Sequence, residues 1–117
     1  MMDPLATGLA KAGVPFAQRH LFVCLGPDCA NFGEGQALWD HMKSRIQKLD
    51  LPIMRTKALC FRICTQGPIL LIYPDGIWYG NVTPARFDRI VKEHVIGNQP
   101  IQDWILVRNA LCPLSTA

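Results

Sequence analysis

Four of the five cysteines in the chain come in two closely spaced pairs. Four residues separate Cys24 from Cys29, and three separate Cys60 from Cys64. No histidine lies within either pair, and four thiolates without histidine bind a soft metal, either zinc or the iron of an iron–sulfur cluster. The two pairs therefore predict one metal centre that takes its ligands from two distant parts of the chain.

The spacing within the pairs favours some of these chemistries over others. Structural zinc sites usually use C-x2-C pairs, and thiol–disulfide enzymes carry C-x-x-C at a helix N-terminus, but neither pair has that spacing. A [2Fe–2S] cluster takes four thiolates, two for each iron, and two loops can supply them, although zinc remains an alternative. A Rieske-type site would need two histidines in place of two cysteines. Cys112 has no partner in the sequence and is expected to be a bystander.

The cysteine pairs follow segments that have the pattern of β-strands. Helical periodicity separates these two segments, and a second helix with Thr83 as N-cap and Pro84 at its first position follows a predicted hairpin. The predicted strands cover 19–23, 53–59, 68–73 and 77–82, and the predicted helices cover 34–49 and 84–96. The order β-α-β-β-β-α is that of a thioredoxin-like α/β fold, a mixed β-sheet with flanking helices. Because both pairs follow strand ends, we expect the four sulfurs to meet at one rim of the sheet.

The chain is long enough for one domain. Residues 1–18 are expected to form an irregular arm, residues 19–107 the thioredoxin-like domain and residues 108–117 a tail. The segment 98–117 is expected to extend the domain, with a short strand or helix at 101–107. Half of the 117 residues are hydrophobic and 18% are charged, which is typical of a folded globule.

Composition also excludes several classes of function. The net charge of +3 is mild and the basic residues are spread among acidic ones, so no nucleic-acid partner is expected. The apolar runs are far shorter than the roughly 20 residues of a membrane helix, so we expect no membrane insertion. The N-terminus lacks the pattern of a secretory signal, and five cysteines leave one unpaired in any disulfide scheme. We therefore expect a soluble protein in a reducing, cytoplasmic environment.

Other residues have simpler interpretations. His20, His41 and His94 lie on or beside predicted elements, where histidines are more often packed or exposed than metal ligands. In a strand, Trp78 and Tyr79 point to opposite faces, so at least one of them should belong to the core.

A family resemblance rests on the cysteine spacing together with two further motifs. They are Cys24-x4-Cys29, Cys60-x3-Cys64 followed by Gly67-Pro68, and the hairpin sequence YPDGIWYG at 73–80. These motifs resemble the thioredoxin-like [2Fe–2S] ferredoxins and the related small subunit of respiratory NADH dehydrogenase, over about residues 20–107. Several of these ferredoxins place their second ligand much further from the first. Here Cys29 follows closely, as in the dehydrogenase subunit, and it is the only candidate near that loop.

The resemblance implies a [2Fe–2S] ferredoxin that carries one electron between a reductase and an acceptor enzyme. Cys24, Cys29, Cys60 and Cys64 would be the cluster ligands. No catalytic acid, base or nucleophile is evident, so the protein is expected not to be an enzyme. The alternative is a structural or regulatory metal domain, with iron–sulfur or zinc, that docks in a larger redox complex. The resemblance also implies a homodimer and suggests a cis bond before Pro68.

Overall fold

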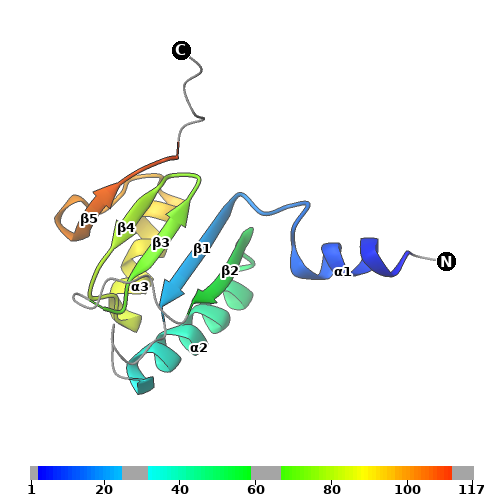
Figure 1. Cartoon of the computed structure of the whole chain (residues 1–117), viewed down its shortest axis with the longest axis horizontal. Helices are drawn as coiled ribbons and strands as arrows, with labels where there is room; N and C mark the ends of the chain where they lie inside the picture. Colours follow the sequence, from blue (N-terminus) through cyan, green and yellow to red (C-terminus); the bar gives the residue numbers. More distant parts are fainter. Residues whose placement is uncertain (1–2, 25–31, 59–66, 112–117) are drawn as a thin grey trace, which may run out of the picture.

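The computed structural model describes residues 3–24, 32–58 and 67–111, and its elements from β1 to α3 follow the predicted order β-α-β-β-β-α (Figure 1). The helices are α1 (Pro4–Ala12), α2 (Phe32–Leu49), α3 (Pro84–Ile90), its π-helical continuation η1 (Val91–Ile96) and the short 3-10 helix η2 (Gln102–Trp104). The strands are β1 (Arg19–Cys24), β2 (Ile53–Ala58), β3 (Leu70–Tyr73), β4 (Ile77–Tyr79) and β5 (Ile105–Arg108).

The strands form one mixed sheet in the order β2-β1-β3-β4-β5. β1 and β2 are parallel because α2 carries the chain back between them, whereas the other neighbours are antiparallel. In the β1–β2 pair, Cys24 lies opposite Ala58. The last residues of β1 and β2 therefore lie at the same end of the strands, which forms one rim of the sheet.

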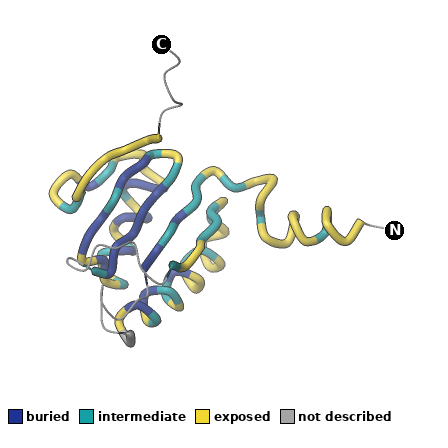
Figure 2. Tube along the Cα trace, viewed as in Figure 1, coloured by how far each residue is buried: buried dark blue, intermediate teal, exposed yellow. Residues whose placement is uncertain are grey.

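Both long helices pack on one face of this sheet. Leu38 and Met42 of α2 and Phe87 of α3 are fully buried against side chains that alternate along the strands. α3 begins as predicted, because the Thr83 hydroxyl accepts a hydrogen bond from the Arg86 N–H at 3.2 Å and Pro84 occupies the first turn. The buried residues of Figure 2 accordingly concentrate in β1, β3 and β4 and in the faces of α2 and α3 that contact them.

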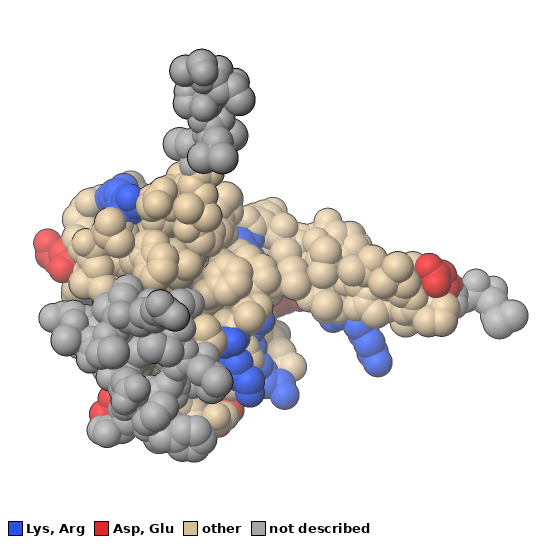
Figure 3. Space-filling view, viewed as in Figure 1, with Lys and Arg blue, Asp and Glu red and all other residues tan. Residues whose placement is uncertain are grey.

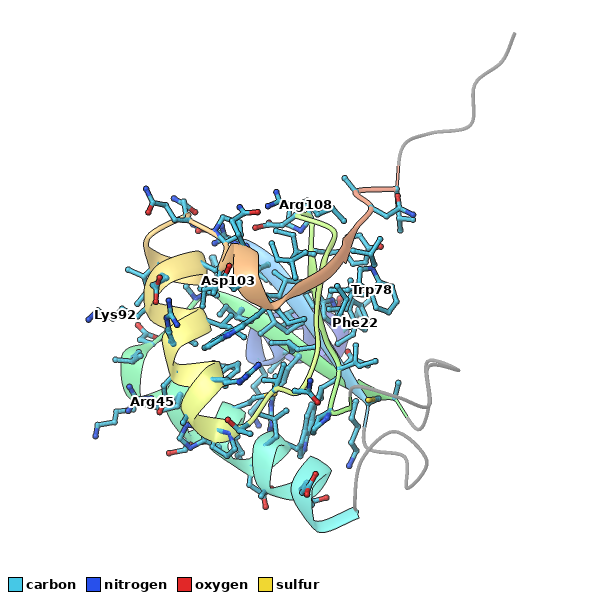
Figure 4. The ribbon with its side chains drawn as sticks, turned by 90° about the vertical axis from the view of Figure 1, so that its left-hand side faces the viewer. Phe22, Arg45, Trp78, Lys92, Asp103 and Arg108 are labelled. Atoms are coloured by element: carbon cyan, nitrogen blue, oxygen red, sulfur yellow. The ribbon has the colours of Figure 1, made fainter. Side chains whose placement is uncertain are left out.

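The opposite side of the sheet carries an aromatic surface that no described helix covers. Phe22 and Trp78 project from it on the side away from α2 and α3 (Figure 4). The imidazole of His20 stacks on Phe22 with 4.3 Å between ring centroids, and the Tyr73 ring meets Phe22 edge-on at 6.4 Å. We call His20, Phe22, Tyr73, Trp78 and Val107 the open face.

The N-terminal segment differs from the expected irregular arm. Residues 4–12 form α1, in which the Asp3 carboxylate accepts a hydrogen bond from the Leu5 N–H and Pro4 begins the helix. Gly13, with φ +83°, ends the helix in the left-handed conformation. No residue of α1 is buried, and the helix extends away from the sheet (Figures 1 and 2). The division of the chain into arm, domain and tail stays a prediction.

The second half of the chain also departs from the expectation in two details. The predicted helix 84–96 changes from α to π geometry at Val91, so that the Gly97 N–H donates to the carbonyl of Lys92, five residues earlier, at 3.2 Å. The segment at 101–107 forms η2 and then β5, which adds a fifth strand to the sheet beside β4. Among the described residues, no helix is both long and apolar enough to cross a membrane.

Candidate metal centre

Cys24 is the one predicted ligand that lies within the described residues. It ends β1, it is fully buried, and its Sγ accepts a hydrogen bond from the Ile69 backbone N–H at 3.2 Å. The Cys24 N–H in turn donates to the Ile69 carbonyl at 3.2 Å. The half-buried Trp78 packs against these two residues from the open face. The sulfur therefore has a fixed position and an amide donor directed at it.

The other predicted ligands fall in segments 25–31 and 59–66. Cys29, Cys60 and Cys64 thus lie outside the described residues, as does Cys112, whose role as a bystander stays a prediction. The described residues that flank the two segments nevertheless lie together at the rim of the sheet. Ala58 is paired with Cys24 there, and the chain returns at Gly67, two residues before Ile69.

The first turns of α2 lie at the same rim of the sheet. Glu34 and Ala37 of α2 line a hollow of about 340 Å³ together with Gly67, Pro68 and the stretch 81–84 that leads into α3. The Gly67–Pro68 bond is cis, as the resemblance suggested, and so is Tyr73–Pro74. Both cysteine-bearing segments therefore start and end near the rim of the sheet, where β1 ends at Cys24.

The surroundings of Cys24 suit a thiolate that binds a metal. A backbone N–H that donates to a thiolate sulfur stabilises its negative charge, and such outer hydrogen bonds tune cluster potentials. Within residues 3–24, 32–58 and 67–111, no three His, Cys, Asp or Glu side chains come together as a competing metal site. The donor type, its burial and its amide partner fit an iron–sulfur cluster. The complete ligand set stays a prediction.

The histidines have other roles. The His20 ring lies 2.7 Å from the Thr56 hydroxyl, and His41 lies 2.7 Å from the Asp88 carboxylate. His94 is fully buried, which agrees with the expectation of a packed residue.

His94 belongs to a buried polar network that the sequence did not reveal. Its Nδ1 accepts a hydrogen bond from the Tyr79 hydroxyl at 2.9 Å, and its Nε2 donates to the Asp75 carboxylate. The Tyr79 oxygen also accepts the Ile101 N–H at 3.0 Å. The Arg19 guanidinium approaches Asp75 at 3.4 Å. This network lies around the β3–β4 turn, at the opposite end of the sheet from Cys24.

Burial, hydrogen bonds and nearby charges together shift the pKa values of this network. Burial lowers the pKa of His94, although the hydrogen bond to Asp75 opposes this, so the imidazole is neutral near pH 7. Burial disfavours the charged form of Asp75, but the hydrogen bond from His94 and the charge of Arg19 outweigh it and hold the pKa of Asp75 below its usual value. Burial raises the pKa of Tyr79. Tyr79 is fully buried and Trp78 only partly, which confirms that at least one of them belongs to the core.

A mixed sheet of thioredoxin type with a buried cysteine at its rim is the frame expected of a thioredoxin-like metal-binding protein, and comparison with known proteins identifies the family. The chain is 31% identical over 99 residues to a [2Fe–2S] ferredoxin of Aquifex aeolicus, which covers 75% of this chain and 88% of the relative. It is 30% identical over 96 residues to a [2Fe–2S] ferredoxin of Clostridium pasteurianum, with 73% and 92% covered. No protein-family model matches the chain.

Solved structures agree with the sequence relatives. The thioredoxin-like [2Fe–2S] ferredoxin from Aquifex aeolicus superposes with a TM-score of 0.71 at 30% identity, covering 80% of this chain and 94% of that one. The structure of its wild-type form at 1.5 Å resolution gives a TM-score of 0.69 at 29% identity, with 79% and 99% covered. The chain belongs to the thioredoxin-like [2Fe–2S] ferredoxin family. The predicted thioredoxin-like fold is confirmed.

Proposed function

We propose that this protein is a one-electron carrier and not an enzyme. The observation that carries the proposal is the buried Cys24 sulfur, which accepts a hydrogen bond from the Ile69 N–H. This sulfur lies at the rim where both cysteine-bearing segments begin and end, and the chain belongs to a [2Fe–2S] ferredoxin family. Cys29, Cys60 and Cys64 would complete the ligand set. When bound, a [2Fe–2S] cluster supplies a site that takes up and releases one electron.

The described residues would support this function by holding the rim of the sheet rigid. Cys24 ends a strand with hydrogen-bonded neighbours on both sides, so its position is fixed by the sheet. The Ile69 N–H stabilises negative charge on the sulfur, and the Trp78 ring keeps water from that side of it. Electron transfer to a partner would occur across a small, transient interface at this rim.

The test is spectroscopic. We expect anaerobically purified protein to be red-brown and silent in electron paramagnetic resonance, and to show one unpaired spin per chain after reduction with dithionite. Repeated cycles of oxidation and reduction should leave the far-ultraviolet circular dichroism unchanged. A colourless protein with about one zinc per chain would refute the carrier and identify a structural metal domain instead.

The ligand set can be tested by matched substitutions. We expect Cys24→Ser, Cys29→Ser, Cys60→Ser and Cys64→Ser each to lose the cluster or to change its visible spectrum. Cys112→Ser is the control for handling and for loss of a thiol, and it should leave iron content and spectrum unchanged. A full cluster in any one of the first four variants, with an unaltered spectrum, would remove that cysteine from the set.

The partners that we propose are a reductase and an acceptor enzyme in the cytoplasm, together with a second copy of this chain. The open face supports the homodimer, since it carries aromatic and aliphatic side chains, and Val107 on it is 53% exposed. None of its five residues is Asp, Glu, Lys or Arg, so two copies of this face can meet without repulsion between like charges.

A further inference from the structure

One edge of the sheet carries two cations stacked over a single tryptophan. Arg55 and Lys57 alternate along β2, so both point toward α2, where Trp39 lies. The Arg55 guanidinium carbon is 3.7 Å from the centre of the indole ring, and the Lys57 ammonium is 5.6 Å from it. Arg55 Nη1 also donates to the Trp39 carbonyl at 2.5 Å. The guanidinium is therefore held in one orientation.

A third cation extends this surface. Lys43 of α2 lines a groove with Arg55 between α2 and β2. Figure 3 shows Lys and Arg side chains gathered over this part of the molecule, beside β2 and α2. We call Trp39, Lys43, Arg55 and Lys57 the β2 basic patch.

Among the described residues, no salt bridge neutralises Arg55 or Lys57 of the patch. In the part of the chain that the structure describes, ion pairs with carboxylates occupy Arg19, Arg45 and Arg89. Burial lowers the pKa of Arg55, and the nearby Asp40 opposes this shift, but a guanidinium remains charged at any physiological pH.

The patch lies at the end of the sheet where the cluster is proposed. Lys57 is paired with Val23, and the next pair in the parallel register is Ala58 with Cys24. Lys57 is thus the residue before Ala58, and the segment that contains Cys60 and Cys64 follows Ala58 directly. The side chains of β2 that form the patch stand on an edge strand, where a partner can reach them.

We propose that the β2 basic patch is the docking surface for an acidic redox partner, which presents carboxylates to Arg55 and Lys57. This inference rests on the proposed electron-carrier function and adds the chemical class of its partner. Tryptophan and arginine are the residues that most often dominate the energy of protein interfaces. Arg55 uses one of its five N–H donors on Trp39, and the remaining donors can bind a carboxylate at two points. Because stacking already fixes the guanidinium, little side-chain entropy is lost on docking.

The experiment measures how fast the reduced protein gives one electron to cobalt(III) complexes of opposite charge, in a stopped-flow instrument. In each reaction the cluster loses one electron and cobalt(III) becomes cobalt(II). The anionic probe is the cobalt(III)–EDTA complex and the cationic probe is hexaamminecobalt(III). Lys57→Glu changes the charge of the patch by two units. For a singly charged anion about 10 Å away we expect a roughly threefold slower reaction at 10 mM ionic strength, and less than about a twofold effect at 100 mM.

The matched control is Lys92→Glu, which makes the same charge change on η1, on the far side of the helices from the open face (Figure 4). Its effect on the anionic probe should stay below about 1.5-fold at 10 mM, since the charge is further from the rim. Arg55→Gln removes one charge and should slow the anionic probe by about half the logarithmic effect of Lys57→Glu. The cationic probe should respond in the opposite direction. Equal effects of Lys57→Glu and Lys92→Glu would overturn the proposal.

A protein partner provides the second arm. We expect a flavodoxin, as a model acceptor with an acidic surface, to lose at least threefold in second-order rate constant with Lys57→Glu, and the loss to disappear at high salt. An unchanged rate constant with flavodoxin would overturn the docking proposal. A protein with no reducible cluster would overturn the proposed function and this inference together. A normal cluster with rates that ignore Lys57 would overturn this inference alone.

Discussion

Removing the hydroxyl of Tyr79 should weaken the fold far more than removing a tyrosine hydroxyl elsewhere on the sheet. This oxygen donates to His94 Nδ1 at 2.9 Å and accepts the Ile101 N–H at 3.0 Å, and the tyrosine side chain is fully buried. Tyr79→Phe therefore leaves two buried polar groups without their partner. Each such group costs about 1–3 kcal/mol, so we expect a loss of about 2–4 kcal/mol in the free energy of unfolding.

Tyr73→Phe is the matched control, because Tyr73 is half-buried on the open face and its hydroxyl has no protein partner among the described residues. Its loss should stay within about 0.5 kcal/mol. Urea unfolding of the anaerobic protein, followed by far-ultraviolet circular dichroism, should show a midpoint lower by about 1–2 M for Tyr79→Phe, given the usual urea dependence for a chain of this size. Equal midpoints for the two variants would refute the assignment of Tyr79 as the centre of the network.

Three further predictions concern other parts of the fold. Gly76→Ala should lower the free energy of unfolding in urea by about 2 kcal/mol or more, because Gly76 has φ +70° and a Cβ there would lie 2.2 Å from the Asn109 carbonyl oxygen. Gly13→Ala, where φ is +83° but the space is open, should cost less, and the reverse order would contradict this reasoning. The free energy of unfolding should fall as pH drops from 7 to 5, by at most about 1.4 kcal/mol per pH unit, because the pKa of His94 is lowered in the folded protein and the unfolded chain takes up the proton first. Urea midpoints that do not change with pH would contradict this role of His94. Phe22→Glu should convert the proposed homodimer to a monomer in sedimentation equilibrium, whereas a dimer that survives would place its interface off the open face.

Local signals were enough to predict most of the frame around the candidate site. The strand that ends at Cys24, the helix that follows it and the turn at Gly76 are each encoded by a few adjacent residues, and the structure confirms all three. The parallel pairing that brings Ala58 beside Cys24 follows from the intervening helix α2. The described flanks of both cysteine-bearing segments therefore lie at one rim, and the meeting of the four sulfurs there stays a prediction.

The interactions that the sequence did not reveal are those between distant residues. His94 meets Asp75 and Tyr79 only because the hairpin and η1 pack together, and nothing near His94 in the sequence marks that meeting. The amide of Ile69 as a donor to the Cys24 sulfur is likewise a consequence of strand pairing over 45 residues. Such contacts depend on register and packing, which periodicity alone does not determine.

The N-terminal helix was missed for a different reason. Its start and stop signals are present, with Asp3 and Pro4 at one end and Gly13 at the other, but Gly8 in the middle weakens the helical pattern. A segment without a buried face lacks the apolar periodicity by which helices are recognised in a sequence. Asp3 as a cap, read together with Pro4, was the signal that could have identified it.

The exposed position of α1 divides the molecule into two parts with different protection against hydrogen exchange. A helix of nine residues with no buried side chain is shorter than the roughly 12–15 residues at which isolated helices become marginally stable. Its amide hydrogens should exchange with solvent at low free-energy cost, whereas those of β1 and β3 should exchange only when the sheet opens as a whole. In the proposed carrier, the strand that holds Cys24 would then belong to the slowest-exchanging unit, and the chain could vary at its N-terminus without disturbing the rim of the sheet.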